Sequence, residues 1–350
     1  MDDRETPQPS RRLEALIVEL TQRCNHDCLH CYNVWKNAAP YPAGELGPAE
    51  TLAMLDRVLD ETAVREVTLT GGEPLLRPDL VEIVEHLRAR GVAVDLISNG
   101  TLIDTALLDR LTPDRIGSWE LPLLSAEAAI HDELSGSAGA FDRVTLAVAE
   151  LKARRQIVVG VVVITRLNLP SLRETVELAF ALGVDALLLN RFNPGGRGFD
   201  NLARLQVTPA ELRAALDLVD ALCVELELPV SCSIAMPPCL FDHARWPALT
   251  FGFCAAGTDE AYYTLDPLGN LRPCNHSPTV LGNVRERGFW ALVEGETMQA
   301  FMAARPAFCD GCAVAETCLG GCKAAAEACY GDLCACDPFL AAFAVEARRR

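Results

Sequence analysis

The sequence predicts an α/β fold in which a partial (β/α)6 TIM-like barrel is followed by a small cysteine-rich C-terminal domain. Short apolar, β-branched runs alternate with amphipathic helical patterns over residues 13–227, as expected of a parallel sheet covered by helices. Nine of the fifteen cysteines lie in the last hundred residues, which sets that region apart. A barrel of eight units needs about 250 residues, and residues 13–227 are fewer, so six units fit better.

The barrel is expected to contain six strands and six helices in alternation. Each strand candidate is a short apolar run, and each helix candidate repeats apolar residues at helical spacing. Proline at position 48 suits the first turn of the first helix. The strands are predicted at 15–20, 66–70, 93–97, 115–121, 157–164 and 186–189. The helices are predicted at 48–63, 78–90, 103–111, 141–154, 169–182 and 209–227.

Changes in composition divide the chain into four parts. Residues 1–12 are polar and contain proline, and we expect a flexible tail there. Residues 13–227 are expected to form the barrel. Residues 228–252 contain four prolines and few helix signals and are expected to be a linker. Residues 253–350 hold the cysteine-rich domain.

Composition and charge exclude several classes of partner. The net charge of −17 at pH 7 argues against nucleic acid, because phosphate backbones are bound by basic faces. No stretch is apolar over the length needed to span a membrane, and residues 1–14 do not resemble a secretion signal. We therefore expect a cytoplasmic protein, because in a reducing compartment clustered cysteines are metal ligands more often than disulfides.

Three cysteines follow the first predicted strand in the spacing CxxxCxxC. They are Cys24, Cys28 and Cys31, and a loop with three thiols this close can fold round one metal centre. Three thiolates on a cube of four irons and four sulfides leave one iron free to bind a small molecule and pass it an electron. The alternative is a zinc site, but structural zinc normally takes four protein ligands, and no fourth cysteine lies nearby.

This spacing resembles the signature of the radical S-adenosylmethionine (SAM) enzymes. The resemblance implies a [4Fe–4S] cluster on Cys24, Cys28 and Cys31, with SAM bound to the open iron through its amino and carboxylate groups. It implies reductive cleavage of SAM to a 5′-deoxyadenosyl radical, which takes a hydrogen atom from the substrate. It also implies an electron donor of the flavodoxin or ferredoxin type.

Further polar residues follow the later predicted strands, and in such barrels chemistry collects at the carboxyl ends of strands. Gly71-Gly72-Glu73 before Pro74 resembles the family motif that binds the SAM amino group, although a plain turn is the alternative. An Asn-Gly turn is the alternative at Ser98-Asn99, and a surface position is the alternative for Arg191. The resemblance implies SAM contacts from Tyr32, Gly71, Gly72, Glu73, Ser98, Asn99 and Arg191.

The C-terminal cysteines follow a second pattern. One cysteine is followed at fixed spacing by Gly269 and a second cysteine, and after a gap comes CxxC-x5-C-x3-C. The pattern resembles the SPASM domain, which implies an iron–sulfur domain with two auxiliary [4Fe–4S] clusters. A pair of zinc sites is the alternative. The resemblance assigns Cys309, Cys312, Cys318 and Cys336 to one cluster and Cys254, Cys274 and Cys322 to the other.

Two ligand positions of the auxiliary clusters stay open. Cys334 is the rival of Cys336 for the last place in its cluster. The other cluster lacks a fourth ligand, because Glu260 stands where some relatives have a cysteine. The candidates for that place are Cys239, Cys329 and an atom of the substrate.

Three functions are compatible with these patterns. The first is a peptide maturase resembling the pyrroloquinoline-quinone, mycofactocin and anaerobic sulfatase-maturating enzymes, with any leader-binding protein on a separate chain. The second is the same chemistry on a small molecule such as a haem precursor, a sugar or an antibiotic intermediate. The third is a non-catalytic electron-transfer or zinc-binding scaffold. Glu120 and Asp200 are available as general bases, and the sequence does not choose between them.

Overall fold

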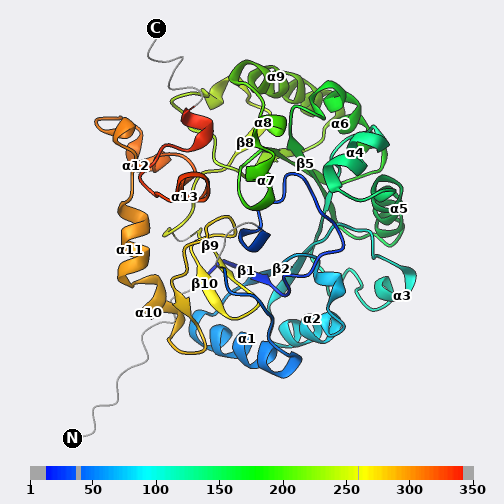
Figure 1. Ribbon diagram of the computed structural model, residues 1–350. Helices are drawn as coiled ribbons and strands as arrows, with labels where there is room; N and C mark the ends of the chain where they lie inside the picture. The colour runs from blue at the N-terminus through cyan, green and yellow to red at the C-terminus, as the bar shows by residue number, and fades with distance from the viewer. Residues whose placement is uncertain (1–12, 37–40, 259, 342–350) are drawn as a thin grey trace, which may run out of the picture.

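The computed structural model describes residues 13–36, 41–258 and 260–341. Its strands form one eleven-stranded sheet that curls into an open barrel with helices outside (Figure 1). No α-helix in these ranges is both long and apolar enough to cross a bilayer. The strands are β1 (Ala15–Glu19), β2 (Glu66–Thr70), β3 (Ala93–Ile97), β4 (Trp119–Pro122), β5 (Val158–Ile164), β6 (Ala186–Arg191), β7 (Val230–Cys232), β8 (Leu249–Phe251), β9 (Tyr262–Leu265), β10 (Asn270–Arg272) and β11 (Gly282–Asn283). The α-helices are α1 (Pro48–Thr62), α2 (Leu80–Ala89), α3 (Thr105–Leu108), α4 (Ala128–Ser135), α5 (Ala140–Ala153), α6 (Leu172–Ala181), α7 (Gly196–Asp200), α8 (Leu202–Leu205), α9 (Pro209–Leu226), α10 (Phe289–Val293), α11 (Glu296–Ala303), α12 (Ala315–Cys318) and α13 (Lys323–Tyr330).

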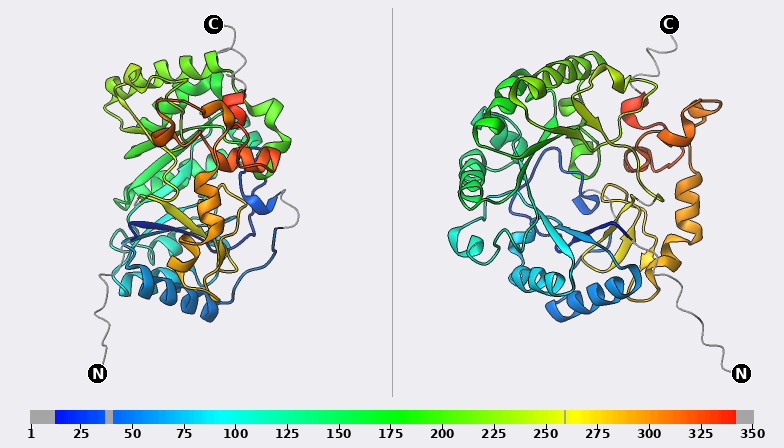
Figure 2. Two further views of the ribbon diagram at one scale, coloured as in Figure 1. Left: turned by 90° about the vertical axis from the view of Figure 1, so that its left-hand side faces the viewer. Right: turned by 180° about the vertical axis from the view of Figure 1, so that it is seen from behind.

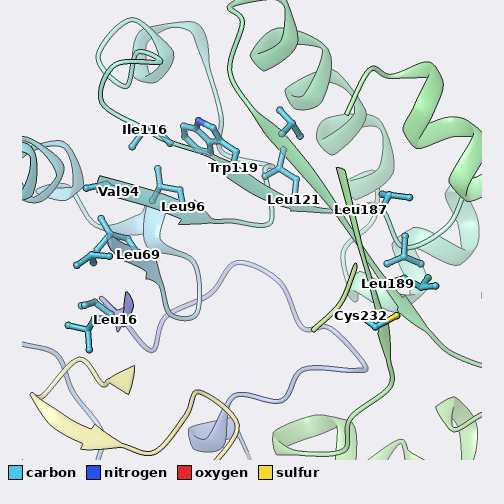
Figure 3. Packing of buried hydrophobic residues seen from close by; sticks show 14 of the residues in the cluster. Leu16, Leu69, Val94, Leu96, Ile116, Trp119, Leu121, Leu187, Leu189 and Cys232 are labelled. Atoms are coloured by element: carbon cyan, nitrogen blue, oxygen red, sulfur yellow. The ribbon is translucent and has the colours of Figure 1, made fainter. Parts of the chain in front are cut away.

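The core lies between the sheet and the outer helices. β1 to β8 lie side by side in chain order and pair in parallel throughout. Successive side chains of a strand point to opposite faces, and in β2 to β6 every second one is buried. Figure 3 shows members of this buried layer, among them Leu69, Leu96, Trp119 and Leu189. The intervening side chains face the barrel interior and stay partly exposed, so polar residues are tolerated there.

The C-terminal domain continues the sheet of the barrel. β9 pairs in parallel with β1, with Ala15 opposite Tyr262 and Val18 opposite Leu265. β10 and β11 follow as antiparallel strands. The helices from α10 to α13 lie along the side where the ring of outer helices is open, and α10 contacts α1 while α13 contacts α7 (Figures 1 and 2). The domain is thus fixed to the barrel at several points.

Local sequence signals explain where two of the longer helices begin. Pro48 opens α1, and the Glu50 carboxylate accepts a hydrogen bond from the Gly47 amide at 3.2 Å. At the start of α9, the Thr208 amide donates to the Glu211 carboxylate at 2.7 Å, and the Glu211 amide donates to the Thr208 hydroxyl at 3.3 Å. Such caps satisfy amides that a helix cannot pair internally, so the start of these helices is set locally.

The predicted α/β fold with a partial barrel is confirmed, and three segments differ from expectation. β4 begins at Trp119 instead of residue 115, because residues 112–116 close a turn in which Thr112 accepts two backbone hydrogen bonds. The helix expected at 103–111 shortens to α3. Residues 228–252, expected to be a linker, carry β7 and β8 and extend the sheet from β6. These two strands are three residues long, too short for a sequence pattern to reveal.

Candidate active site

The loop after β1 carries the CxxxCxxC cysteines across the carboxyl end of the barrel. Burial, and then the neighbouring thiols of Cys31 and Cys24, raise the pKa of the Cys28 thiol, so the three sulfur atoms lie close together. The His26 amide donates a hydrogen bond to Cys24 Sγ at 3.4 Å. The Lys36 ammonium lies near all three thiols and favours their anionic form. This setting suits the thiolate ligands of a metal centre.

The three thiols are not arranged round a single metal ion. Across residues 13–36, 41–258 and 260–341, no three His, Cys, Asp or Glu side chains are arranged to hold one metal ion. Zinc draws its sulfur ligands to about 2.3 Å from one centre. A cubane carries each thiolate on a different iron and therefore keeps the sulfurs farther apart. The three cysteines fit the iron–sulfur cluster that the sequence implies.

The Gly71-Gly72 pair supports the cysteine loop from the neighbouring strand. The Gly72 amide donates to the Thr21 carbonyl at 2.7 Å, and the Glu73 amide donates to the Arg23 carbonyl at 2.8 Å. A Cβ atom on Gly72 would lie 2.2 Å from the Arg23 carbonyl oxygen, which is closer than such atoms can approach. Glycine is thus required for packing against the loop, a reason additional to the SAM contact implied by the motif.

Replacing Gly72 with alanine is expected to displace the cysteine loop and lower its iron occupancy. The added Cβ meets backbone atoms, which cannot rotate away as a side chain would. We expect roughly a twofold or greater loss of the first cluster, because metal binding depends on a preformed ligand set. Iron analysis and electron paramagnetic resonance after anaerobic reconstitution measure this loss. Gly47→Ala is the matched control, since a Cβ there meets only Glu50 at 3.7 Å; equal iron in both variants would contradict the role of Gly72.

The buried Glu73 carboxylate joins the turns that follow β2 and β3. Its oxygens accept hydrogen bonds from the Leu75 amide at 3.0 Å, the Ser98 hydroxyl at 2.8 Å and the Asn99 amide at 2.8 Å. Burial raises the pKa of Glu73, and these hydrogen bonds oppose that rise. A carboxylate has about four acceptor positions, so about one remains for the ammonium group of a ligand.

Asn99 extends this network to the cysteine loop. Its Nδ2 donates to Asn25 Oδ1 at 2.8 Å, and Asn25 Nδ2 donates to Thr101 Oγ1 at 3.0 Å. Asn33 Nδ2, at the far end of the loop, donates to the Gly71 carbonyl at 3.0 Å. The structure therefore brings five of the expected SAM residues, those of the two turns, together beside the three cysteines.

Tyr32 lies on the other side of the cysteine loop, against the C-terminal domain. Its ring stacks on His276 with centroids 3.9 Å apart, and its hydroxyl accepts a hydrogen bond from Asn275 Nδ2 at 3.0 Å. The sequence analysis expects this ring at the SAM. In the structure, one face of the Tyr32 ring and its hydroxyl contact the segment that follows Cys274. Tyr32 therefore connects the cysteine loop to that segment.

Arg191 also has a different partner from the SAM contact expected from the sequence. Its Nη2 donates to Asp337 Oδ2 at 2.6 Å, and both side chains are fully buried. Its Nε donates to the Ala235 carbonyl at 3.1 Å, and its guanidinium lies 4.6 Å from the centre of the Phe339 ring. Arg191 is on the same buried face of β6 as Leu189. It therefore points away from the barrel interior and joins the barrel to the C-terminal segment.

The first auxiliary group, Cys254, Cys274 and Cys322, comes together beside the barrel. Burial, and then the thiols of Cys322 and Cys254, raise the pKa of the Cys274 thiol to about 12. Asn193 Nδ2 donates to Cys322 Sγ at 3.4 Å, and the Cys322 amide donates to the Asp337 carboxylate at 3.0 Å. Hydrogen bonds to sulfur tune the potential of a bound cluster, so the contact from Asn193 has a direct chemical use.

A buried ion pair holds this group to the end of β1. The Arg272 guanidinium donates to the Glu19 carboxylate, and both side chains are buried. The same guanidinium donates to the carbonyls of Asn275 and Ser277 at 3.2 and 3.0 Å. A buried charge is costly unless it is paired. The pair therefore fixes the backbone that follows Cys274 against the first strand.

The second auxiliary group is Cys309, Cys312 and Cys318. Burial, and then the thiols of Cys318, Cys312 and Cys336, raise the pKa of Cys309. Cys336, the expected fourth ligand, thus lies near one member of the group, whereas its rival Cys334 is exposed. The three expected ligands of this cluster are again neighbours.

Two further cysteines, candidates for the open place in the first auxiliary group, lie apart from each other. Burial, and then the Asp337 carboxylate and the Cys322 thiol, raise the pKa of Cys329 to about 12, so Cys329 lies beside the first auxiliary group. Burial, and then the thiols of the second auxiliary group, raise the pKa of Cys239 to about 11. Cys239 therefore lies nearer the second auxiliary group, whereas the sequence analysis considers it for the first.

Comparison with known proteins decides the family. The family model described as the radical SAM superfamily matches residues 18–179, and the model described as the iron-sulfur cluster-binding domain SPASM matches residues 254–313. The PqqA peptide cyclase of Methylocella silvestris is 30% identical over 336 residues, with 93% of this chain and 86% of that protein covered. This chain is a radical SAM enzyme with a C-terminal SPASM domain. Its cofactors are SAM, the radical SAM [4Fe–4S] cluster and auxiliary iron–sulfur clusters.

Other relatives of this radical SAM enzyme differ in function. The AdoMet-dependent heme synthase of Methanosarcina barkeri is 29% identical over 341 residues, covering 92% of this chain and 94% of that protein. Two solved structures share the fold at 17% identity. One is anSMEcpe with bound AdoMet, with a TM-score of 0.72 over 96% of this chain and 94% of that one. The other is Streptococcus suis SuiB bound to the precursor peptide SuiA, with a TM-score of 0.71 over 90% and 72%.

The barrel interior of this radical SAM enzyme holds three carboxylates. Glu66, Asp95 and Glu120 stand on β2, β3 and β4 among the inward-facing residues. Burial, and then the carboxylates of Asp95 and Glu66, raise the pKa of Glu120 to about 7. A general base works best when its pKa lies near the working pH. Of the two bases considered from the sequence, Glu120 has this environment, whereas Asp200 is exposed on α7.

Replacing Glu120 with glutamine is expected to stabilise the enzyme at alkaline pH only. The pKa is raised from 4.5 to about 7, so the stability contributed by the protonated carboxyl is present below pH 4.5 and is lost as the pH rises through 7. The glutamine variant escapes that loss. Its thermal midpoint should exceed that of the wild type by roughly 2–4 °C at pH 8.5 and match it at pH 5. The exposed Asp200→Asn change is the control, and a difference independent of pH would contradict this assignment.

Several residues that position the cluster ligands were missed by the sequence analysis. Glu19 had a usable signal, since it is a charged residue at the end of an otherwise apolar strand, whereas Arg272 shares its short strand with Asn270 and had no such signal. Lys36, Asn193 and Asp337 had none. Their roles arise because segments far apart in the sequence come into contact in the fold. Such contacts cannot be predicted from the local sequence.

Proposed function

We propose that this enzyme cleaves SAM reductively to a 5′-deoxyadenosyl radical, which abstracts a hydrogen atom from a peptide and so starts a post-translational modification. The first cluster, on Cys24, Cys28 and Cys31, supplies the electron for that cleavage when bound. The two auxiliary groups each hold a [4Fe–4S] cluster, and a flavodoxin- or ferredoxin-type protein is the electron donor. Because none of the fifteen cysteines, all of which lie in the described residues, forms a disulfide, a reducing compartment, the cytoplasm, suits the enzyme.

The arrangement of the cysteine loop and the two polar turns carries this proposal. The loop lies at the carboxyl end of the strands, where barrels of this kind place their chemistry. Glu73, Ser98 and Asn99 lie next to it and offer acceptors and donors for a ligand with ammonium, carboxylate and hydroxyl groups. In these roles the residues bind and orient SAM, and the buried backbone around them excludes water.

The functions named for relatives support a peptide as the substrate. The curated relatives named PqqA peptide cyclase and the structure of SuiB with its precursor peptide support the same substrate class. A separate leader-binding protein would complete the system.

A small-molecule substrate is the second candidate. The relative named AdoMet-dependent heme synthase matches this chain as well as the peptide cyclases do, at 29% identity over nearly the whole length of both. Under this alternative the same cluster loop and turns act on a haem precursor or a similar intermediate.

Product analysis after anaerobic reconstitution tests both candidates. The protein is reduced with SAM, and 5′-deoxyadenosine is measured by liquid chromatography alone, with peptides encoded beside its gene, and with haem precursors. We expect a peptide to stimulate 5′-deoxyadenosine formation and to change in mass. Stimulation by a haem precursor alone would favour the second candidate. No 5′-deoxyadenosine under any condition would contradict both.

A further inference from the structure

Asn193, on the loop after β6, reaches a proposed cluster ligand from a buried position. The residue is only 5% exposed, and its Nδ2 lies 3.4 Å from Cys322 Sγ. Asn193 directly precedes Pro194, and a residue before proline is largely restricted to extended backbone. The side chain that meets the sulfur therefore starts from a backbone with little freedom.

The second partner of Asn193 fixes which end of its amide faces the sulfur. Arg191 Nη1 lies 3.2 Å from Asn193 Oδ1. A guanidinium group has donors only, so the amide must turn its oxygen toward Arg191. The NH2 end is then the one that faces Cys322, and the contact is an N–H···S hydrogen bond.

Arg191 is itself held, and its partners close a ring of hydrogen bonds around Cys322. Its Nη2 donates to Asp337 Oδ2 at 2.6 Å, and the same carboxylate oxygen accepts a hydrogen bond from the Cys322 amide at 3.0 Å. Both charged side chains are fully buried. The ring joins Asn193, Arg191, Asp337 and Cys322, and each of its bonds can run in one direction only.

The rest of the loop after β6 packs against the first cysteine loop. The Gly198 amide donates to the Cys31 carbonyl at 2.9 Å. A Cβ atom on Gly196 would lie 2.4 Å from the Asn33 carbonyl oxygen, so the two backbones are in close contact there. α7 contacts both the short helix Val34–Lys36 and α13. The segment that carries Asn193 is therefore fixed between the first cysteine loop and the C-terminal domain.

We propose that Asn193 raises the reduction potential of the auxiliary cluster that Cys322 ligates. Reduction by one electron adds negative charge to a cluster and its thiolates, and an N–H donor stabilises the more negative state. Hydrogen bonds to sulfur are among the features that set the potentials of such clusters. The inference rests on the proposed cluster of Cys254, Cys274 and Cys322, and it holds for either substrate. The barrel, through the end of β6, then makes this cluster a better electron acceptor.

A potentiometric titration of the holoenzyme, followed by electron paramagnetic resonance, tests the proposal. The auxiliary signal that is lost in Cys322→Ala identifies the cluster concerned. Asn193→Leu keeps a similar side-chain volume and removes the donor. At the potential that half-reduces this cluster in the wild type, we expect the ratio of reduced to oxidised cluster to fall about tenfold in Asn193→Leu, which is about 59 mV for one electron. The midpoints of the other clusters should not move.

Asn168→Leu is the matched control for the loss of a buried amide. Asn168 lies after β5, is also buried, and donates to the carbonyls of Leu124 and Val163 at 2.6 and 2.9 Å. Its replacement should leave every midpoint unchanged. An unchanged midpoint in Asn193→Leu, or an equal shift in both variants, would overturn the proposal.

A measurement on the wild type keeps the proposal testable if Asn193→Leu does not assemble the cluster. The holoenzyme is prepared with asparagine labelled with nitrogen-15 in the side-chain amide, and pulsed electron paramagnetic resonance of the reduced cluster records its couplings. We expect a weak nitrogen-15 coupling, because the amide of Asn193 is hydrogen-bonded to a ligand sulfur. A cluster without this coupling would overturn the proposal alone. A wild-type enzyme with no cluster on Cys322 would overturn the cluster assignment as well.

Discussion

Cys28→Ala is expected to abolish the reductive cleavage of SAM, with a loss of about 10³-fold or more in 5′-deoxyadenosine formation. Cys28 lies between two other thiols in the loop after β1, and its removal leaves two ligands where the cluster needs three. An incompletely held cluster is lost or rearranged, so no site remains for SAM to bind and accept an electron. Liquid chromatography of the nucleoside and iron analysis of the protein measure both effects.

Two further variants distinguish the loss of the radical SAM cluster from the loss of an auxiliary cluster and from a general effect of removing a cysteine. Cys318→Ala removes a thiol that we propose as a ligand of an auxiliary cluster, and it should stop product formation while sparing part of the uncoupled SAM cleavage. Cys223→Ala removes a buried thiol of α9 that belongs to none of the three groups and should behave like the wild type. Equal loss of SAM cleavage in Cys28→Ala and Cys318→Ala would contradict separate roles for the clusters.

Asp337→Ala is expected to cost about 3–5 kcal/mol of stability, since removal of one partner leaves a buried charge uncompensated. Arg191 and Asp337 are both fully buried, and the Asp337 carboxylate also accepts a hydrogen bond from the Cys322 amide at 3.0 Å. A cost of this size is a large part of the stability of a typical domain. We therefore expect a lower soluble yield, a lower urea midpoint and loss of the adjacent auxiliary cluster.

A double variant separates the charge from the shape of the site. Arg191→Met with Asp337→Leu removes both charges and fills a similar volume, so it should recover most of the stability lost in Asp337→Ala. The exposed ion pair of Arg285 and Glu50 provides the control; Glu50→Gln should change the stability by less than about 1 kcal/mol. A single variant as stable as this control would show that the buried pair contributes little.

Much of the fold was predictable because its signals are local. The apolar runs of β1, β2, β3, β5 and β6 are read directly from the sequence, and Pro48 and Pro209 mark helices that begin at those residues. β7 and β8 were not predictable, since Val230–Cys232 and Leu249–Phe251 become strands only through pairing with β6 and with each other. The sheet decides their conformation, and the sheet is not visible in a short window of sequence.

The candidate site divides in the same way. Spacing alone groups Cys24, Cys28 and Cys31, because neighbouring ligands on one loop leave little choice of geometry. The partner of Arg191 is not fixed by neighbouring residues in the sequence. At the end of β6 its side chain reaches Asp337, which lies 146 residues later in the chain.

The parallel pairing of β1 with β9 affects how fast electrons can move in this molecule. The cysteines proposed for the radical SAM cluster follow β1, and Cys274, which we propose as an auxiliary ligand, follows β10, which is paired with β9. Electron tunnelling slows steeply as the gap between redox centres widens. Had the two domains been joined by a hinge, that gap would fluctuate with every thermal swing. Because both groups of cysteines follow strands of one hydrogen-bonded sheet, the distance between the two redox centres is expected to stay the same from one turnover to the next.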